Sequence, residues 1–344
     1  MILPRAKSSV TIADVAREAG VSTATVSRVI NENAPVSAAT AMRVRAAIER
    51  LNYRPSAAAR GLASRRTHLI GLLAEEISAP FFAPILRGIE KGAREAGLGL
   101  LIHCTQGTPA ANSGYRRPLG PHNTDGILVF AGGLQEEELV YLTSLEFPVV
   151  LLHRSPPDSL DIPAVTVENK RGARELVRHL IEVHGYRRIA FLRGPEGHED
   201  SYWREQGYRE ALAAADIPIE PQLLAYGGFD QKIAQQAVTA WLEQGVKPDA
   251  IFAGDDEAAT GTIMALQAAG LRVPEDVAVV GFDDVYLAHP LMPPLTTVHV
   301  PIEAVGREGV RELVRLIAGG EPEPLTLLPT ELVIRRSCGC QEEA

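Results

Sequence analysis

The sequence is poor in the residues and runs that mark secreted or membrane proteins. It contains only three cysteines, Cys104, Cys338 and Cys340, so a disulfide framework is excluded as the source of its stability. Its first residues, MILPRAKSSV, lack the long apolar core of a signal peptide, and no apolar run approaches the ~18 residues of a membrane span. A soluble, cytoplasmic protein is therefore expected.

Catalytic signatures are missing as well. The sequence has no Walker loop, no G-x-S-x-G elbow, no H-E-x-x-H pair and no G-x-G-x-x-G after a strand. Its nine histidines are scattered without metal-ligand spacing, and Cys338-Gly-Cys340 is an isolated C-x-C pair in a polar tail. These absences predict a protein that is not an enzyme and that carries no cofactor and no metal.

Charge is distributed unevenly along the 344 residues, a length that suits two or three structural units. Residues 1–66 hold eleven Arg and Lys against four Asp and Glu, a net charge of +7, whereas the remainder has a net charge of −16. A basic head on an acidic body suits a head that meets phosphates and a body that does not.

The stretch TIADVAREAGVSTATVSRVI (residues 11–30) has the pattern of two short helices joined by a tight turn. Thr11 and Asp14 have the spacing of a capping box, Gly20 supplies a left-handed turn residue, and Ser22 can cap the second helix. Such a pair forms a helix-turn-helix whose second helix exposes polar side chains to DNA bases. The alternative is an ordinary helical hairpin at a domain terminus.

A third helix and a linker follow. Ser37 is expected to cap a helix that runs to about Leu51, with an apolar stripe of Met42, Val44, Ala47, Ile48 and Leu51. The segment from Pro55 to Ala63 favours a helix too short to be stable alone, so it reads as a linker that orders only when a partner supports it. A plain flexible connection is the alternative.

From His68 onwards, short apolar runs alternate with amphipathic segments, which predicts parallel sheets covered by helices on both faces. Seven strands are more than one small sheet usually takes, so two doubly wound lobes with a cleft at the carboxyl ends of the strands are expected. The predicted strands are LIGLLA, LGLLIHC, DGILVFA, FPVVLLH, RRIAFLRG, PDAIFAGD and DVAVVGFDD. The predicted helices include Ala83–Ala96, Arg171–His184, Glu205–Ala214, Lys232–Gln244 and Glu257–Ala269.

Together these features resemble the lac repressor/GalR family of bacterial transcription regulators over nearly the whole chain. The most specific matches are TIADVAREAGVSTATVSRVIN, LNYRPSAAARGLA, WREQGYREAL, and LRVPEDVAVVGFDD with PPLTTV. The resemblance implies a helix-turn-helix domain at residues 1–54, a hinge helix at 55–66, and a two-lobed effector-binding and dimerisation domain of the periplasmic-binding-protein type at 67–344. With no leucine heptad after Arg336, a homodimer is expected.

The resemblance also implies which residues contact DNA. Thr23, Ala24 and Arg28 should lie nearest the bases, and Leu62 matches a leucine wedge between base steps at the operator centre. Because the side chains at 23 and 24 are small, Arg28, the linker and DNA shape should carry much of the specificity. The other implied DNA contacts are Thr11, Ser22, Thr25, Ser27, Asn31, Tyr53, Ala59 and Arg60.

For the effector, the resemblance implies a small carbohydrate in the cleft between the lobes. An arginine, two carboxylates and a flat ring can bind the hydroxyls and the C–H face of a sugar. The implied effector contacts are Phe81, His153, Arg204, Phe229, Asp255 and Asp283. His153 stands where the family usually has Asp, and Asp255 where Asn is commoner. Phe81 and Phe229 can instead be core residues, and Asp283 can instead cap a turn.

The leading hypothesis is a repressor of sugar-utilisation genes that a sugar releases from a pseudo-palindromic operator. One alternative keeps the DNA-binding role but replaces the inducer by a corepressor, such as a purine, or by a partner protein. Another makes the body a solute-binding protein, against which the basic head argues.

Overall fold

The computed structural model describes residues 10–31, 34–53, 66–105 and 119–341. Its contacts divide the chain into two compact units, residues 1–67 and 68–344, which we call the head and the body. The predicted hinge at 55–66 lies outside the described residues except for Arg66, so the predicted domain bounds stay predictions. Among the described residues, no helix is both long and apolar enough to cross a membrane.

The head consists of helices α1 (Ile12–Ala19), α2 (Thr23–Asn31) and α3 (Ala38–Arg50). The predicted local signals are confirmed. Thr11 and Asp14 form the capping box of α1, Gly20 ends that helix with φ 64°, and the Ser37 side chain accepts from the backbone N–H of Thr40 at the start of α3.

Side chains from all three helices form the core of the head, with Val15, Val26 and Val44 fully buried. One residue of the predicted α3 stripe was wrong: Met42 is 72% exposed. Met42 lies only two positions from Val44, and on a helix a two-residue step turns the side chain to the opposite side. Val44 and Ala47 form the buried face instead.

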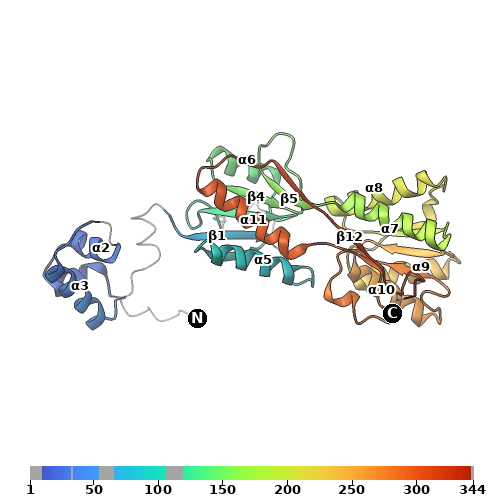
Figure 1. Ribbon diagram of the computed structural model, residues 1–344, viewed down its shortest axis with the longest axis horizontal. Helices are drawn as coiled ribbons and strands as arrows, with labels where there is room; N and C mark the ends of the chain where they lie inside the picture. Colours follow the sequence, from blue (N-terminus) through green and yellow to red (C-terminus); the bar gives the residue numbers. More distant parts are fainter. Residues whose placement is uncertain (1–9, 32–33, 54–65, 106–118, 342–344) are drawn as a thin grey trace, which may run out of the picture. The chain divides into compact units, whose positions relative to one another are not determined.

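The body contains two lobes, each built on a parallel sheet (Figure 1). In the first, which we call the N-lobe, the strand order is β11-β5-β4-β3-β1-β2, and helices α5 and α11 pack side by side. Its strands are β1 (Leu69–Ala74), β2 (Gly99–Cys104), β3 (Gly126–Phe130), β4 (Val149–Leu152), β5 (Ala164–Val167) and β11 (Leu325–Leu328). Its helices are α5 (Phe82–Glu95), α6 (Glu136–Ser144) and α11 (Ile302–Ile317).

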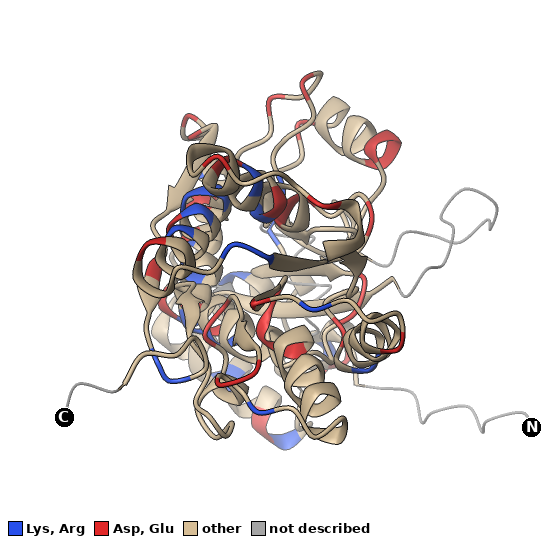
Figure 2. Ribbon diagram, turned by 90° about the vertical axis from the view of Figure 1, so that its right-hand side faces the viewer, with Lys and Arg blue, Asp and Glu red and all other residues tan. Residues whose placement is uncertain are grey.

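In the second, the C-lobe, the strand order is β7-β6-β8-β9, and helices α7 and α8 pack against each other, as do α9 and α10. Its strands are β6 (Ile189–Arg193), β7 (Leu224–Tyr226), β8 (Ala250–Ala253) and β9 (Ala278–Val280). Its helices are α7 (Asn169–His184), α8 (Glu199–Ala214), α9 (Gln231–Glu243) and α10 (Asp256–Ala268), with short 3₁₀ turns at η1 (Pro221–Leu223) and η2 (Tyr286–Ala288). Acidic and basic residues are interspersed on the helices of the body (Figure 2).

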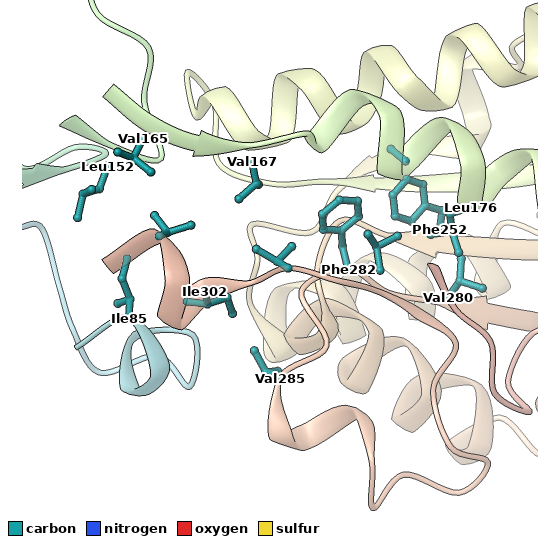
Figure 3. Packing of buried hydrophobic residues seen from close by; sticks show 14 of the residues in the cluster. Ile85, Leu152, Val165, Val167, Leu176, Phe252, Val280, Phe282, Val285 and Ile302 are labelled. Carbon is teal, nitrogen blue, oxygen red and sulfur yellow. The ribbon is translucent and has the colours of Figure 1, made fainter. Parts of the chain in front are cut away.

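The chain passes between the lobes three times. It does so between β5 and α7, between β10 (Thr297–His299) and α11, and between β11 and β12 (Glu331–Val333), where β10 and β12 pair as an antiparallel ribbon. One hydrophobic cluster continues through this region, from Leu152 and Val165 in the N-lobe to Phe252 and Phe282 in the C-lobe (Figure 3). The crossing segments therefore belong to a shared core that positions the two sheets.

All seven predicted strands of the body are confirmed, and so is the doubly wound, two-lobed fold. The prediction missed β5, β7, β10, β11 and β12, which have three or four residues each and are too short to give a hydrophobic pattern. Helix α8 begins at Glu199, six residues before its predicted start. The prediction placed the start too late because the first turn is polar and acidic, which suits a helix N-terminus but gives no apolar pattern. The irregular stretch noted at 105–124 lies largely outside the described residues.

Candidate functional site

Helix α2 of the head has one buried and one exposed face. Val26 and Val29 pack in the core of the head, whereas Thr23, Ala24 and Arg28 are exposed on the opposite side. Ser22 caps the helix by accepting from the backbone N–H of Thr25 at 3.1 Å. The three residues predicted to read bases therefore share an open helix face, as a recognition helix requires.

Two other predicted DNA contacts have roles within the head. The Thr11 hydroxyl donates to the carboxylate of Asp14 at 2.7 Å, in addition to the two backbone bonds of their capping box. Tyr53 is only 8% exposed and packs in the core of the head, so most of its ring is closed to DNA. Ala59, Arg60 and Leu62 lie outside the described residues.

In the body, Arg204 is the centre of a buried polar network between the lobes. Its guanidinium donates to the Asn169 side chain at 2.9 Å, to the carbonyl of Gly254 at 2.8 Å and to Asp283 at 2.7 Å. It also lies 4.0 Å above the ring of Phe282. Arg204 is 1% exposed, so this charge depends wholly on these partners.

The network continues from the C-lobe to the N-lobe through His153, which follows β4. Its Nδ1 lies 3.0 Å from Asp200, and Asp200 accepts from Asn169 at 2.8 Å. Beside it, the backbone N–H and hydroxyl of Ser155 donate to Glu199 at 2.6 and 2.5 Å. Helix α8 of the C-lobe is thus tied to the N-lobe by two adjacent carboxylates.

Three of the predicted effector residues have unusual backbone conformations. His153 and Phe229 have φ of 53°, and Asp283 has φ of 104°, values that L-residues rarely adopt. The Phe229 ring also fits only because Gly194 and Gly254 lack a side chain: a Cβ on either would lie within 3 Å of it. Strained conformations of this kind cluster at ligand sites, where the surrounding structure enforces them.

Burial and neighbouring charges shift the pKa values of the carboxyl groups in the network. Burial, and secondarily the charge of Asp283, raises the pKa of Asp255 to about 8. Burial also raises the pKa of Asp283, although Arg204 opposes it. For Asp200, burial alone would raise the pKa, but the charge of His153 and its hydrogen bond hold that pKa below its usual range.

Asp255 has a structural role as well. It is the N-cap of α10, where its carboxylate accepts from the backbone N–H of Ala258 at 2.8 Å. Its neighbour Asp256 accepts from Thr297 at 2.6 Å and from the backbone N–H of Val285 at 2.9 Å, which ties α10 to the crossing segments.

Two imidazoles beside the network keep a ring nitrogen without a partner in the described part of the chain. These atoms are Nε2 of His153 and Nδ1 of His198, both buried. Phe81 lies edge-on to His153, with ring centroids 5.0 Å apart, and Phe229 lies edge-on to His198 at 5.5 Å. Buried polar atoms are normally satisfied, so this pairing of polar atoms and aromatic rings points to a ligand.

A separate cavity of about 620 Å³ lies next to this network, between α5, the segment after β9 and the start of α11. Among the predicted effector residues, only Asp283 lines it. Its lining is otherwise mainly apolar, with Tyr286 and Pro301 among its members. We take the Arg204 network as the candidate site, because it contains the strained residues and the unpartnered nitrogens.

The structure thus brings Arg204, Phe229 and Asp283 into direct proximity, with His153 joined to them through Asp200 and Asn169. Sequence reasoning missed Asn169, His198, Glu199 and Asp200. A signal existed for Asp200, because it precedes Arg204 by one helical turn and shares its face of α8.

Comparisons with known proteins agree with this architecture. Residues 11–56 match the family described as "Bacterial regulatory proteins, lacI family", and residues 177–338 match the periplasmic binding protein-like domain. The transcriptional repressor PurR of Aliivibrio fischeri (strain MJ11) is 36% identical over 95% of this chain and 97% of its own.

Two solved structures are similar over nearly the whole chain. The transcriptional regulator CelR, solved with cellobiose, is 34% identical over 95% of this chain and 99% of its own, with a TM-score of 0.69. The lac repressor dimer bound to operator and the anti-inducer ONPF is 28% identical over 96% of this chain and 99% of its own, with a TM-score of 0.81.

A helix-turn-helix head and a two-lobed, periplasmic-binding-protein-like body define a ligand-responsive transcription regulator. The chain belongs to the LacI family of bacterial regulatory proteins, and it is a DNA-binding transcriptional repressor.

Proposed function

We propose that this repressor holds a pseudo-palindromic operator as a homodimer and releases it when a small carbohydrate binds at the Arg204 network. The observation that carries the proposal is the pair of unpartnered nitrogens on His153, which lies beside Phe81, and on His198, which lies beside Phe229. Sugar hydroxyls can satisfy both nitrogens, and a sugar C–H face can pack on an aromatic ring. The solved complex of the related CelR with cellobiose supports this class of ligand.

The network also supplies a mechanism that couples ligand binding to the arrangement of the two lobes. His153 and Ser155 belong to the N-lobe, whereas Asp200 and Glu199 belong to α8 of the C-lobe. A sugar that binds His153 changes the energy of this tie and so favours one arrangement of the lobes over another. Only such differential binding shifts a conformational equilibrium; tight binding to both arrangements would not.

The response reaches DNA through the linker between body and head. In this proposal Leu62, matched by resemblance to a leucine that wedges between base steps, loses its site when the lobe arrangement changes. In the same proposal, Thr23, Ala24 and Arg28 contact the bases and determine which DNA sequence is bound. The residues nearer the phosphates are Ser22, Thr25, Ser27 and Asn31. A mobility-shift titration with the chain's own promoter checks the wedge: Leu62→Ala should weaken binding, and unchanged affinity and specificity would refute it.

Ligand binding itself is tested by a thermal-shift screen of the full chain against mono- and disaccharides, cellobiose included. One sugar should raise the melting temperature of the wild type, and His198→Ala should lose that shift. The control is His122→Ala, because His122 is exposed on the N-lobe. A sugar-induced shift that His198→Ala retains in full would place the ligand elsewhere.

A corepressor is the second candidate, favoured by the 36% identity to PurR and by the aromatic rings of Phe81 and Phe229, which can stack on a flat base. In that case a purine, and no sugar, would raise the melting temperature and strengthen operator binding. The sign of the change in operator affinity separates the two candidates.

A further inference from the structure

Four side chains that can ligate a metal converge at the far end of α7 from the Arg204 network. His179 and His184 come from the last turns of α7, and Cys338 and Cys340 come from the chain's final segment. One ligand atom from each residue lies within 4.8 Å of all the others. His184 and Cys340 are 156 residues apart in the sequence, so spacing alone did not indicate that they meet.

The distances between these atoms fit a tetrahedral zinc site. Zinc binds thiolate at ~2.3 Å and imidazole at ~2.0–2.1 Å, so a tetrahedral angle separates a sulfur from a nitrogen by about 3.6 Å. The Nε2 atom of His179 lies 3.6 Å from the sulfurs of both cysteines, and Nε2 of His184 lies 3.4 Å from the sulfur of Cys340. The remaining separations are within 4.8 Å, so the ligand atoms must close by roughly 1–1.5 Å at most to surround one ion.

The surrounding structure holds these ligands in place. The ring of Tyr186 stacks on His184 at 5.3 Å, and its hydroxyl donates to the carbonyl of Cys338 at 3.2 Å. Gly339 has φ 107°, and a Cβ there would lie 3.2 Å from both His184 and Tyr186. A glycine between the two cysteines therefore lets the tail turn tightly against the imidazoles.

The tail that carries the cysteines is anchored independently of them. The backbone N–H of Val279 donates to the carbonyl of Ser337 at 2.9 Å, and the Ser337 hydroxyl accepts from the backbone N–H of Thr296 at 2.8 Å. Cys338 is fully buried directly after this anchor. Both cysteines are free thiols in the structure.

We propose that His179, His184, Cys338 and Cys340 bind one structural zinc ion that fastens the C-terminal tail to the end of α7. Two thiols lose their protons to solvent, two neutral imidazoles donate through Nε2, and the resulting Zn²⁺–dithiolate site carries no net charge. With four protein ligands the coordination is closed, so the site is structural and not catalytic. This inference is independent of the effector site.

Metal content tests it first. The tag-free full chain, grown with zinc and desalted without chelator, should contain about one zinc per chain by mass spectrometry of the metal. Cys340→Ser and His184→Gln should lose most of it. Cys104→Ser is the matched control, because Cys104 ends β2 in the other lobe, and it should retain the metal.

A spectroscopic readout keeps the test valid if a variant folds poorly. Wild-type chain stripped of metal and given Co²⁺ should show the intense visible absorption of tetrahedral thiolate-bound cobalt, and Zn²⁺ should displace it. The proposal would be overturned if reduced wild-type chain is purified without metal and also fails to show this absorption when Co²⁺ is added. It would also be overturned by a Cys338–Cys340 disulfide in the native chain, seen as a loss of two hydrogens in the intact mass, or by equal zinc in Cys340→Ser.

Discussion

The head and the body use polar residues in opposite ways. On α2 of the head, the polar residues Thr23 and Arg28 are exposed, opposite the face that packs in the core. In the body, Arg204, Asp283 and Asp200 are buried: Arg204 donates to Asp283, and Asn169 links Arg204 to Asp200. Asp200 also pairs with His153 of the N-lobe, so the candidate site helps to hold the two lobes together. Substitutions on this exposed face should therefore change DNA affinity alone, whereas substitutions in the network should change stability and ligand response together.

The largest expected effect is the loss of the buried guanidinium. Arg204→Met removes the partner of Asp283 and leaves a buried carboxylate uncompensated, which should lower the free energy of unfolding by about 3–5 kcal/mol. Denaturant unfolding of the full chain measures it. Arg178→Met on α7 is the control, because Arg178 is 61% exposed in a 3.7 Å pair with Glu182, and its loss should cost at most about 1 kcal/mol. Equal losses for the two variants would refute the central role of Arg204.

A smaller effect, on DNA affinity, is expected from a substitution in the head, and this substitution should leave the stability of the body unchanged. Arg28→Ala removes a side chain that can bond bidentately to guanine, so operator affinity should fall by about 1–3 kcal/mol, or roughly 5- to 150-fold. Arg17→Ala on α1 removes the same charge from a residue paired with Asp14 at 3.0 Å. Anisotropy titrations should show lost discrimination between operator and random DNA for Arg28→Ala only. The same loss in both variants would indicate a purely electrostatic role.

The last predicted effect, the smallest when it is measured over one pH unit, is a dependence of stability on pH. Since burial raises the pKa of Asp255 to about 8, the folded chain holds a proton there that the unfolded chain releases near pH 4. The stabilisation from this proton is complete below pH 4 and is lost as pH rises towards 8, by up to about 1.4 kcal/mol per pH unit. Asp255→Asn can still cap α10 but cannot titrate, so its stability should fall less between pH 5 and pH 8.

Asp230 provides the matched control for that measurement. It caps α9 as Asp255 caps α10, by accepting from the backbone N–H of Ile233 at 2.8 Å, but it is exposed. Denaturant unfolding across the same pH range should give wild-type slopes for Asp230→Asn. Parallel curves for wild type and Asp255→Asn would show that Asp255 is already ionised in the folded chain.

The sequence predicted the features that depend on neighbouring residues and missed those that depend on contacts between distant segments. The caps at Thr11 and Ser37, the turn at Gly20 and the seven body strands depend on neighbouring residues, and each was predicted correctly. The partners of Arg204 come from three distant segments, and the short strands β10 and β12 form only because the crossing segments meet. The convergence of His184 with Cys340 likewise arises from tertiary structure, which residue spacing does not contain.

Operator affinity with and without ligand is the decisive measurement of whether a sugar at the Arg204 network controls DNA binding. Anisotropy titrations of the full chain on its own promoter DNA should find one mono- or disaccharide that weakens binding by about tenfold, within the usual range of allosteric coupling. His122→Ala should keep this response and His198→Ala should lose it. Control by a sugar at this site is refuted if no sugar weakens binding while a purine strengthens it, or if His198→Ala responds as the wild type does.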